Sequence, residues 1–327
     1  MMIRAIYFSK DETLRTDLDM MEVAFLLQGL EGLLWVDFQG NPPEKDKEIL
    51  SETFGFHPLA IEDALEEAHV PKIDDWGKYL YIVLHAVLAG ENHEVDTLEL
   101  DVFLGENYLV THHDEEIEAV TRVWDNIHRD SRHLRNGPDH LLYRVVDELV
   151  ASYMPVVETL DQWIDQIEDQ LFNYPKPEIV EQIFAVKRAV LHLRRMIGPQ
   201  REVLNKMARD DYPTIDQQAQ VYFRDIYDHL VRLYSIAENI RDLVSDTMDT
   251  YLSVLNNRLN EVMKTLTIIT TLFMPITFIT GFFGMNFFFP HEIFSSWTRL
   301  PVFLFTMALL LIIPITIFLW IRRRGWM

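Results

Sequence analysis

The stretch that decides the fold is Lys264 to Asn286, which reads KTLTIITTLFMPITFITGFFGMN. No charged residue follows Lys264 until His291, and a second interval without charge spans 300–321. Each interval is longer than the roughly 20 residues that an α-helix needs to cross a bilayer core of about 30 Å. The sequence therefore predicts two transmembrane helices near its C-terminal end, the first over about 264–285.

The residues that flank the spans predict their orientation. Trp320 and three arginines, 322–324, end the second span, whereas the loop 286–299 carries a single arginine. Positively charged residues stay preferentially on the cytoplasmic side of a membrane. We therefore expect a multi-pass protein of the cell (inner) membrane, with both termini and the tail 322–327 in the cytoplasm and the loop in the periplasm. A buried helix of a soluble core is the alternative for either span alone, but two adjacent spans favour the membrane.

Composition limits the partners that the chain can bind. The sequence of 327 residues has 51 acidic and 29 basic residues, a formal net charge of -22, and no cysteine. Such a chain repels nucleic acid and attracts cations. The absence of cysteine excludes disulfides, thiolate metal sites and cysteine nucleophiles.

Upstream of the first span, the pattern changes twice. Residues 1–136 mix short β-rich runs with helical stretches, and residues 137–215, which follow the break RNGPDH, contain long acidic helices. Residues 216–285 then form a long helix that includes the first span. The predicted fold class is an α+β cytoplasmic domain followed by long helices and two C-terminal transmembrane helices.

A single helix is predicted from Asp216 to Phe283, with Pro275 as its one proline. At 1.5 Å per residue it measures on the order of 100 Å, which is too long for a member of one compact domain. Its first half carries apolar residues alternately four and three positions apart, as in a coiled coil. We expect this seam to pack against helices from several subunits. The seam consists of Ile226, Leu230, Leu233, Ala237, Ile240 and Val244.

A polar stripe follows another face of the same helix into the membrane span. Steps of three and four residues connect small, polar or methionine side chains, whereas leucine, isoleucine and phenylalanine fill most membrane positions between them. Leu266, with Met263 and Met274, is a candidate for an apolar collar that closes a pore by dewetting. The stripe consists of Asp249, Ser253, Asn256, Asn260, Met263, Thr267, Thr270, Met274, Thr277 and Gly281.

Helix packing is the alternative interpretation of the stripe, because Thr and Gly in membrane helices also serve close contacts between helices. Packing accounts poorly for Asn256 and Asn260 and for the continuity of the stripe, since polar amides near a membrane are costly. We therefore favour a pore. One stripe cannot enclose a pore, so the pore must form on the symmetry axis of a homo-oligomer.

Two histidine-containing segments invite a metal-site interpretation. For THHDEE, residues 111–116, we favour the end of a strand followed by a helix that Asp114 caps. His57, which precedes Pro58, is interpreted as the start of a helix rather than as a ligand.

The tripeptide GMN, Gly284 to Asn286, follows NEVMKTLTIITTLFMPITFITGFF and precedes a short loop, a second span and a basic tail. With HPLAIEDALEE, VPKID, VYFRDIYDH and ENIRDLVSDTMDTYLS upstream, the chain resembles the CorA family of magnesium and cobalt transporters over nearly its whole length. Two places depart from the family's pattern: Phe283 stands where Tyr is usual, and FFFPHEIF, with Glu292, replaces a more acidic loop.

The resemblance implies a funnel-shaped homopentameric channel in membrane lipid, with the first spans as an inner ring and the second spans as an outer ring. It implies that Gly284, Met285 and Asn286 form the selectivity filter at the periplasmic entrance. The implied function is influx of magnesium, with cobalt and nickel as further ions, and no enzymatic activity. Mg²⁺ is then both the transported and the regulatory ion.

Four carboxylates match positions that bind regulatory divalent ions between cytoplasmic domains of neighbouring subunits in the family: Glu62, Asp63, Asp147 and Asp225. An ion that bridges two subunits neutralises repelling carboxylates, so high internal magnesium would lock the channel closed.

Two other functions are weighed against a magnesium channel. A zinc transporter of the same superfamily usually has Val where this chain has Met285. A membrane-anchored enzyme would need a phosphate-binding loop, a nucleophile elbow or a histidine–carboxylate metal spacing, and the sequence has none of these motifs.

We predict that Asn286→Ala abolishes magnesium uptake and leaves the oligomer intact, because the amide oxygens would no longer accept hydrogen bonds from the waters of the ion. Uptake by cells and the size of the purified complex are the measurements. Retained uptake in an intact oligomer would remove the filter assignment.

Overall fold

The computed structural model describes residues 2–16, 18–29, 32–66, 70–90, 93–173, 176–285 and 300–324. The predicted loop 286–299, including Asn286 of the candidate filter, lies outside these residues. The chain divides into two compact units, Met1–Met248 and Asp249–Met327.

Runs of β-branched and aromatic residues form one mixed sheet in the first unit. Its strands lie in the order β2-β1-β3-β7-β6-β5-β4, and all neighbouring pairs are antiparallel except β3 and β7, which are parallel. Residues 79–87 of β5 are all buried, as expected for a strand covered on both faces. The strands are β1 (Met2–Ser9), β2 (Leu14–Thr16), β3 (Gly32–Gln39), β4 (Lys72–Asp75), β5 (Tyr79–Ala89), β6 (Val95–Gly105) and β7 (Tyr108–His113).

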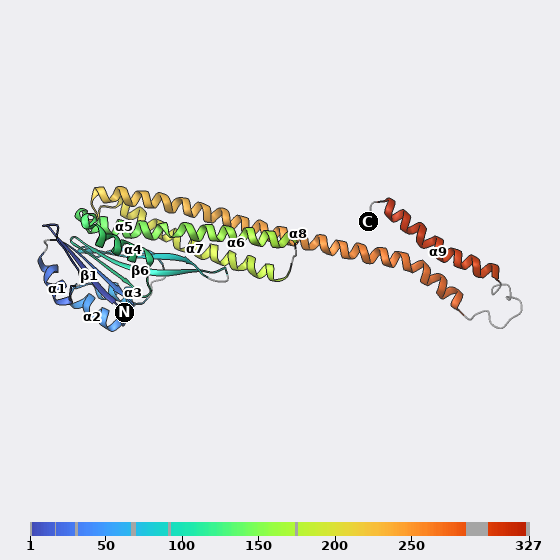
Figure 1. Ribbon diagram of the computed structural model, residues 1–327, viewed down its shortest axis with the longest axis horizontal. Coiled ribbons are helices and arrows are strands. Elements are labelled where there is room, and N and C mark those ends of the chain that lie inside the picture. The colour runs from blue at the N-terminus through green and yellow to red at the C-terminus, as the bar shows by residue number, and fades with distance from the viewer. Residues whose placement is uncertain are drawn as a thin grey trace. The chain divides into compact units, whose positions relative to one another are not determined.

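Helices cover both faces of this sheet (Figure 1). The helices α1, α2 and α3 pack on one face, where Val23, Leu50 and Ala60 join strand residues such as Val36 and Phe103 in a hydrophobic core. The helices α4 to α7 and the first part of α8 lie on the other face. The helices are α1 (Met20–Gly29), α2 (Pro43–Glu52), α3 (Pro58–Leu65), α4 (Glu118–Arg129), α5 (Pro138–Ala151), α6 (Tyr153–Asn173), α7 (Glu178–Arg209), α8 (Gln217–Gly284) and α9 (Leu300–Arg323).

The expected break after residue 136 is a change of secondary structure inside the first unit. A 3-10 helix, Ser131–Asn136, ends there, and α5 begins at Pro138 after Gly137, whose φ of 97° favours glycine. Hydrogen bonds tie the later helices to the sheet: the Tyr153 hydroxyl donates to the His85 carbonyl at 2.7 Å, and the His85 N–H donates to Gln200 at 2.9 Å.

The seam of α8 is buried by helices of the same chain, so the prediction that it packs against other subunits is wrong. Ile226, Leu230 and Ala237 are fully buried within one chain. Arg194 of α7 pairs with Glu238 of α8 at 3.0 Å, which places α7 beside the seam. The apolar spacing correctly indicated a helix-packing face, but a sequence spacing does not say which chain supplies the partner.

The predictions for the two histidine-containing segments have different outcomes. The His57 side chain accepts a hydrogen bond from the Leu59 N–H at the start of α3, with Pro58 in the first turn, so this prediction is confirmed. Asp114 is not a cap, because α4 begins only at Glu118, after Ile117 and without a side-chain cap. Residues 114–117, which have no regular secondary structure, separate the strand from the helix there.

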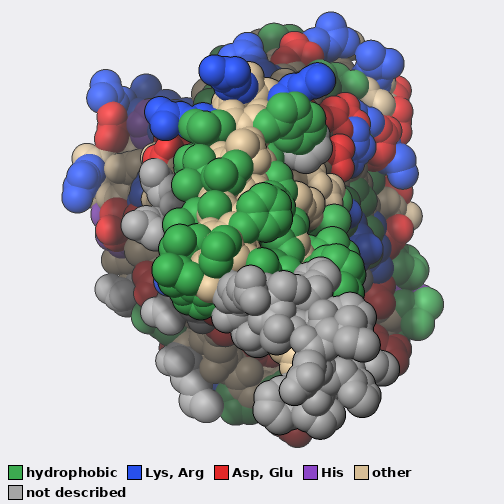
Figure 2. Space-filling model, turned by 90° about the vertical axis from the view of Figure 1, so that its right-hand side faces the viewer, with side chains coloured by type: hydrophobic (Ala, Val, Ile, Leu, Met, Phe, Trp, Pro, Cys, Tyr) green, Lys and Arg blue, Asp and Glu red, His purple; other side chains and the backbone are tan. Residues whose placement is uncertain are grey.

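In the second unit, the end of α8 and the whole of α9 expose apolar side chains. Both helices are long and apolar enough to cross a membrane, and the most hydropathic stretch of each is unburied. Hydrophobic side chains gather on the part of the surface nearest the viewer in Figure 2, which this unit forms. In this unit Phe273, Phe278, Phe305 and Leu311 are each at least 60% exposed. Such a surface is stable only when lipid or other protein covers it.

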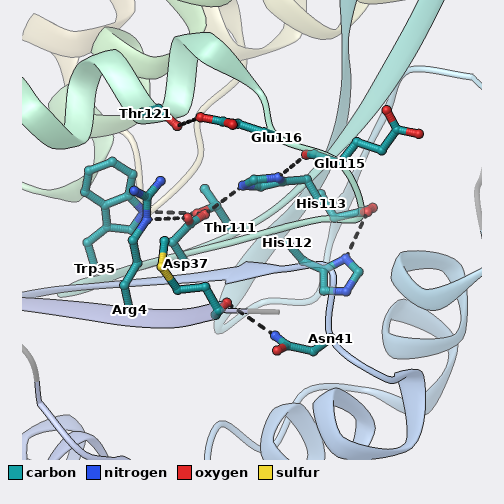
Figure 3. A network of polar contacts seen from close by, with 12 residues as sticks. Arg4, Trp35, Asp37, Asn41, Thr111, His112, His113, Glu115, Glu116 and Thr121 are labelled. Carbon is teal, nitrogen blue, oxygen red and sulfur yellow. Dashed lines mark hydrogen bonds and ion pairs between the residues drawn. The ribbon is translucent and has the colours of Figure 1, made fainter.

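A buried ion-pair network joins β1, β3 and β7 on the face that carries α4 (Figure 3). Asp37 receives the Arg4 Nε–H at 2.8 Å and the Thr111 hydroxyl at 2.5 Å, and the His113 Nε2 lies 3.2 Å away. Burial by itself raises the pKa of Asp37, but His113, Arg4 and Thr111 lower it below its ordinary value. The Arg4 guanidinium also lies 4.3 Å from the centre of the Trp124 ring.

We predict that Asp37→Ala lowers the free energy of unfolding by about 3 kcal/mol, because Arg4 would remain in a largely buried site without its counter-charge. Denaturant unfolding of the purified chain measures this effect, and Asp125→Ala, a change at an exposed position of α4, is the control. Since the pKa of Asp37 is depressed, the stabilisation is present above the ordinary carboxyl value and is lost as the pH falls below it. Equal stability of the two variants would contradict the prediction.

Candidate functional site

The polar stripe of α8 lies on the surface of the second unit. Met263 is 65% exposed, Met274 71% and the candidate collar residue Leu266 63%, whereas the apolar Phe278 is 73% exposed. Exposure in one chain therefore does not separate a pore-facing side from a lipid-facing side. The difference between the two sides is chemical, because one carries oxygen, amide and thioether groups and the other carries hydrocarbon.

The threonines of the stripe satisfy their hydroxyl protons on their own helix. The hydroxyls of Thr267, Thr270 and Thr277 donate to the backbone carbonyls four residues earlier, at 2.7, 2.9 and 2.9 Å. Thr265 and Thr280, which lie off the stripe, do the same. A hydrogen bond from a threonine hydroxyl to its own helix therefore does not identify a pore-lining residue. It does leave each threonine oxygen able only to accept hydrogen bonds from its surroundings.

The glycines at the outer end of α8 are not crowded by the described part of their own chain. A Cβ at Gly281 or Gly284 would meet no atom within 4 Å in one chain, and neither residue has a positive φ. Helix α8 ends at Gly284, and Met285 donates its N–H to the Phe282 carbonyl at 3.4 Å. The described residues of one chain therefore impose no steric need for glycine at these two positions.

The four predicted regulatory carboxylates fall into two groups. On α3, Glu62 is exposed, and Asp63 binds the Lys72 ammonium of β4 at 2.5 Å. Sequence reasoning missed Lys72. The signal that could have found it is the pattern Lys-x-Asp on a strand, which places Lys72 and Asp74 on one face shortly after an acidic helix.

The second group joins α5 to the first part of α8. The Tyr143 ring stacks on Tyr222 with centroids 4.8 Å apart, which holds Asp147 and Asp225 within electrostatic reach of each other. Burial raises the pKa of Asp147; Arg144 and His229 oppose the rise, and the charge of Asp225 adds to it. A further cation near these two carboxylates would be favourable.

The described part of one chain does not complete a metal site from these groups. Among the residues that the structure describes, no three His, Asp or Glu side chains are arranged to hold one ion. The donors are nevertheless all carboxylate oxygens, the ligand type that hard cations such as Mg²⁺ prefer.

Two exposed apolar helices, each long enough to cross a membrane, together with a large mixed α/β unit, are typical of a membrane protein with a large domain outside the bilayer. The model of the CorA-like Mg²⁺ transporter protein family matches residues 31–323, and the chain belongs to this family. This membership confirms the resemblance found in the sequence, and it places the chain among transporters rather than enzymes.

Individual relatives agree with the family. The chain is 35% identical over 292 residues to the putative metal ion transporter YfjQ of Bacillus subtilis, covering 89% of each chain. It is 35% identical over 299 residues to the cobalt/magnesium transport protein CorA of Thermotoga maritima, covering 90% of this chain and 83% of the other.

A solved structure supports the predicted fold class. The CorA magnesium transporter from Methanocaldococcus jannaschii matches with a TM-score of 0.85 at 24% identity, over 100% of this chain and 99% of the other. At that identity the likeness concerns the fold alone. It confirms the soluble α/β region, the long helix and the two C-terminal apolar helices.

We predict that Thr277→Val reduces divalent-ion flux several-fold, whereas Thr280→Val leaves it near the wild-type rate. Both hydroxyls donate to the carbonyl four residues earlier, and that of Thr280 also reaches the Thr277 carbonyl at 3.1 Å. Only Thr277 belongs to the stripe. Ion flux into liposomes measures the difference, and the size of the complex checks assembly. Equal flux in the two variants, with intact complexes, would favour helix packing as the role of the stripe.

Proposed function

We propose that the chain forms a homopentameric channel that admits hydrated Mg²⁺, with Co²⁺ and Ni²⁺ as further ions, across the cell membrane into the cytoplasm. The observation that carries this proposal is the continuous polar stripe on the otherwise apolar membrane part of α8. Both termini lie in the cytoplasm, and lipid covers the remaining apolar surface of α8 and α9.

Assembly follows from the chemistry of the stripe. A polar face that the described part of its own chain leaves exposed must meet water or other copies of itself, and five stripes around one axis would enclose a pore. The number five comes from the family resemblance. The open space around Gly281 and Gly284 among the described residues supports crowding of five helices around that axis.

The stripe suits an ion that keeps its waters. Mg²⁺ releases water reluctantly, and the bound waters point their hydrogens outward, so a passing hydrated ion needs acceptors along its path. Thr267, Thr270 and Thr277 are such acceptors because their own protons are already bonded to the backbone. Asn286, in the filter Gly284 to Asn286, would contact the hydrated ion at the outer entrance with a neutral amide that does not retain it.

The inner half of the pathway combines acidic, polar and apolar positions. Asp249 is exposed near the boundary between the two units and would concentrate cations at the inner mouth. Asn256 and Asn260 add polar rings, whereas Met263 and Leu266 narrow the pore with apolar side chains that close it by dewetting.

Gating depends on divalent ions that bridge neighbouring soluble units. Glu62 and Asp63 on one chain would meet Asp147 and Asp225 on the next, completing a carboxylate site that the described residues of one chain do not form. Bound Mg²⁺ then offsets the repulsion between these acids and stabilises the closed state, and its loss at low internal concentration releases the units.

We predict that the double variant Asp63→Asn/Asp225→Asn keeps conducting at internal magnesium concentrations that close the wild-type channel. Mg²⁺ flux into liposomes, measured at low and high magnesium on the side of the soluble units, gives the comparison. Neutralisation removes the ligands that the closing ion requires, so its inhibition should be lost. Inhibition equal to that of wild type would contradict a sensor at these residues.

Ion flux into liposomes also distinguishes a magnesium channel from a zinc transporter of the same superfamily. A magnesium channel conducts Mg²⁺ and Co²⁺ more readily than Zn²⁺, whereas a zinc transporter shows the reverse order. No flux of any of the three ions through an intact oligomer would contradict the proposed function.

A further inference from the structure

The ammonium of Lys72 forms an ion pair with Asp63, one of the carboxylates of the proposed gating site. The Lys72 Nζ lies 2.5 Å from Asp63 Oδ2, so an ion pair joins β4 to α3. The side chains of Lys72 and Asp63 are 32% and 44% exposed, so solvent and ions reach the pair. A pair this exposed is weak enough to exchange.

Lys72 also has a second carboxylate within reach. Asp74, two residues further along β4, places its Oδ2 3.4 Å from the same nitrogen. The Tyr81 ring on the neighbouring strand β5 has its centre 5.3 Å from the ammonium and is held in place by a 2.6 Å hydrogen bond to Asp101. The ammonium can therefore leave Asp63 for Asp74 without losing its counter-charge.

We propose that Lys72 is a built-in competitor for the divalent ion at Asp63, and that it sets the magnesium concentration at which the gating site fills. This inference rests on the proposed function, in which Asp63 is a ligand. When an ion arrives, the ammonium moves to Asp74, and Asp63 is released to the ion. When the ion leaves, the ammonium returns, so that Asp63 is not left with an unbalanced negative charge.

The competition has a physical basis in both charge and geometry. An ammonium bonded to Asp63 blocks one of its oxygens, and its positive charge repels an approaching divalent ion. Burial by itself would lower the pKa of Lys72, but Asp63 and Asp74 raise it, so the side chain remains charged.

The test measures how Mg²⁺ stabilises the purified full-length protein. A ligand that binds the folded state raises the thermal midpoint, and the concentration for a half-maximal rise reports its affinity. We expect Lys72→Gln to lower this concentration about two- to five-fold, the range that corresponds to the loss of one exposed ion pair. Lys72→Arg, which keeps the charge, should remain near wild type.

Lys78 provides the matched control. It is exposed, lies six residues away in the turn after β4, and has no ion pair among those the structure describes. Lys78→Gln removes the same charge from the same region, so it reports the general electrostatic effect. An equal shift for Lys78→Gln and Lys72→Gln would overturn the competitor role.

Asp74→Asn tests the second position of the ammonium. Without Asp74, Lys72 should hold Asp63 more persistently, so the half-maximal concentration should rise. In a Lys72→Gln background the same change should have a much smaller effect, since no ammonium remains to be redirected. An equal effect of Asp74→Asn in both backgrounds would contradict the proposed exchange.

Asp63→Asn separates failure of this inference from failure of the proposed site. If Asp63→Asn removes most of the magnesium response and Lys72→Gln leaves the half-maximal concentration unchanged, Asp63 is a ligand and Lys72 is only structural. If Asp63→Asn keeps the full response, both the gating site and the competitor are wrong. A lower midpoint of Lys72→Gln without magnesium, with an unchanged half-maximal concentration, also counts against competition.

Discussion

Inside a bilayer, a side chain that can hydrogen-bond must find its partner in the protein, in another copy of the protein, or in a water-filled pore. This constraint governs α8, whose membrane part carries one polar face among apolar ones. The threonine hydroxyls of this face donate their protons to carbonyls of their own helix. Their oxygens remain free to accept hydrogen bonds from another copy of the protein or from water in a pore. The proposed channel follows, because several copies around one axis give every stripe the same aqueous surroundings.

Acidic residues of the soluble unit have different roles, and the role depends on how deeply each side chain is buried. Asp37 is fully buried and has Arg4, His113 and Thr111 as fixed partners, so it stabilises the sheet. Asp63 is partly exposed and shares Lys72 with Asp74, so its partner is exchangeable. A fixed network supports a fold, whereas an exchangeable pair near the surface suits a site that fills and empties.

Much of the fold could be predicted from the sequence because its signals are local. Charge-free runs long enough to span a membrane mark α9 and the end of α8, and uninterrupted helical periodicity gives α8 almost its full extent. The start of α5 at Pro138 follows from a glycine–proline pair. The candidate stripe could also be predicted from the sequence, since residues three and four apart share one face of a helix.

Contacts between distant segments could not be predicted in this way. The sequence by itself determined that Ile226 and Leu230 face a partner, but only the tertiary structure decided that the partner is the chain's own helical layer. The tertiary structure likewise decided that Lys72 pairs with Asp63 and that Asp114 does not cap α4. The physical reason is that periodicity specifies which side of an element is apolar or charged, whereas the packing of strands and helices in space specifies what that side meets.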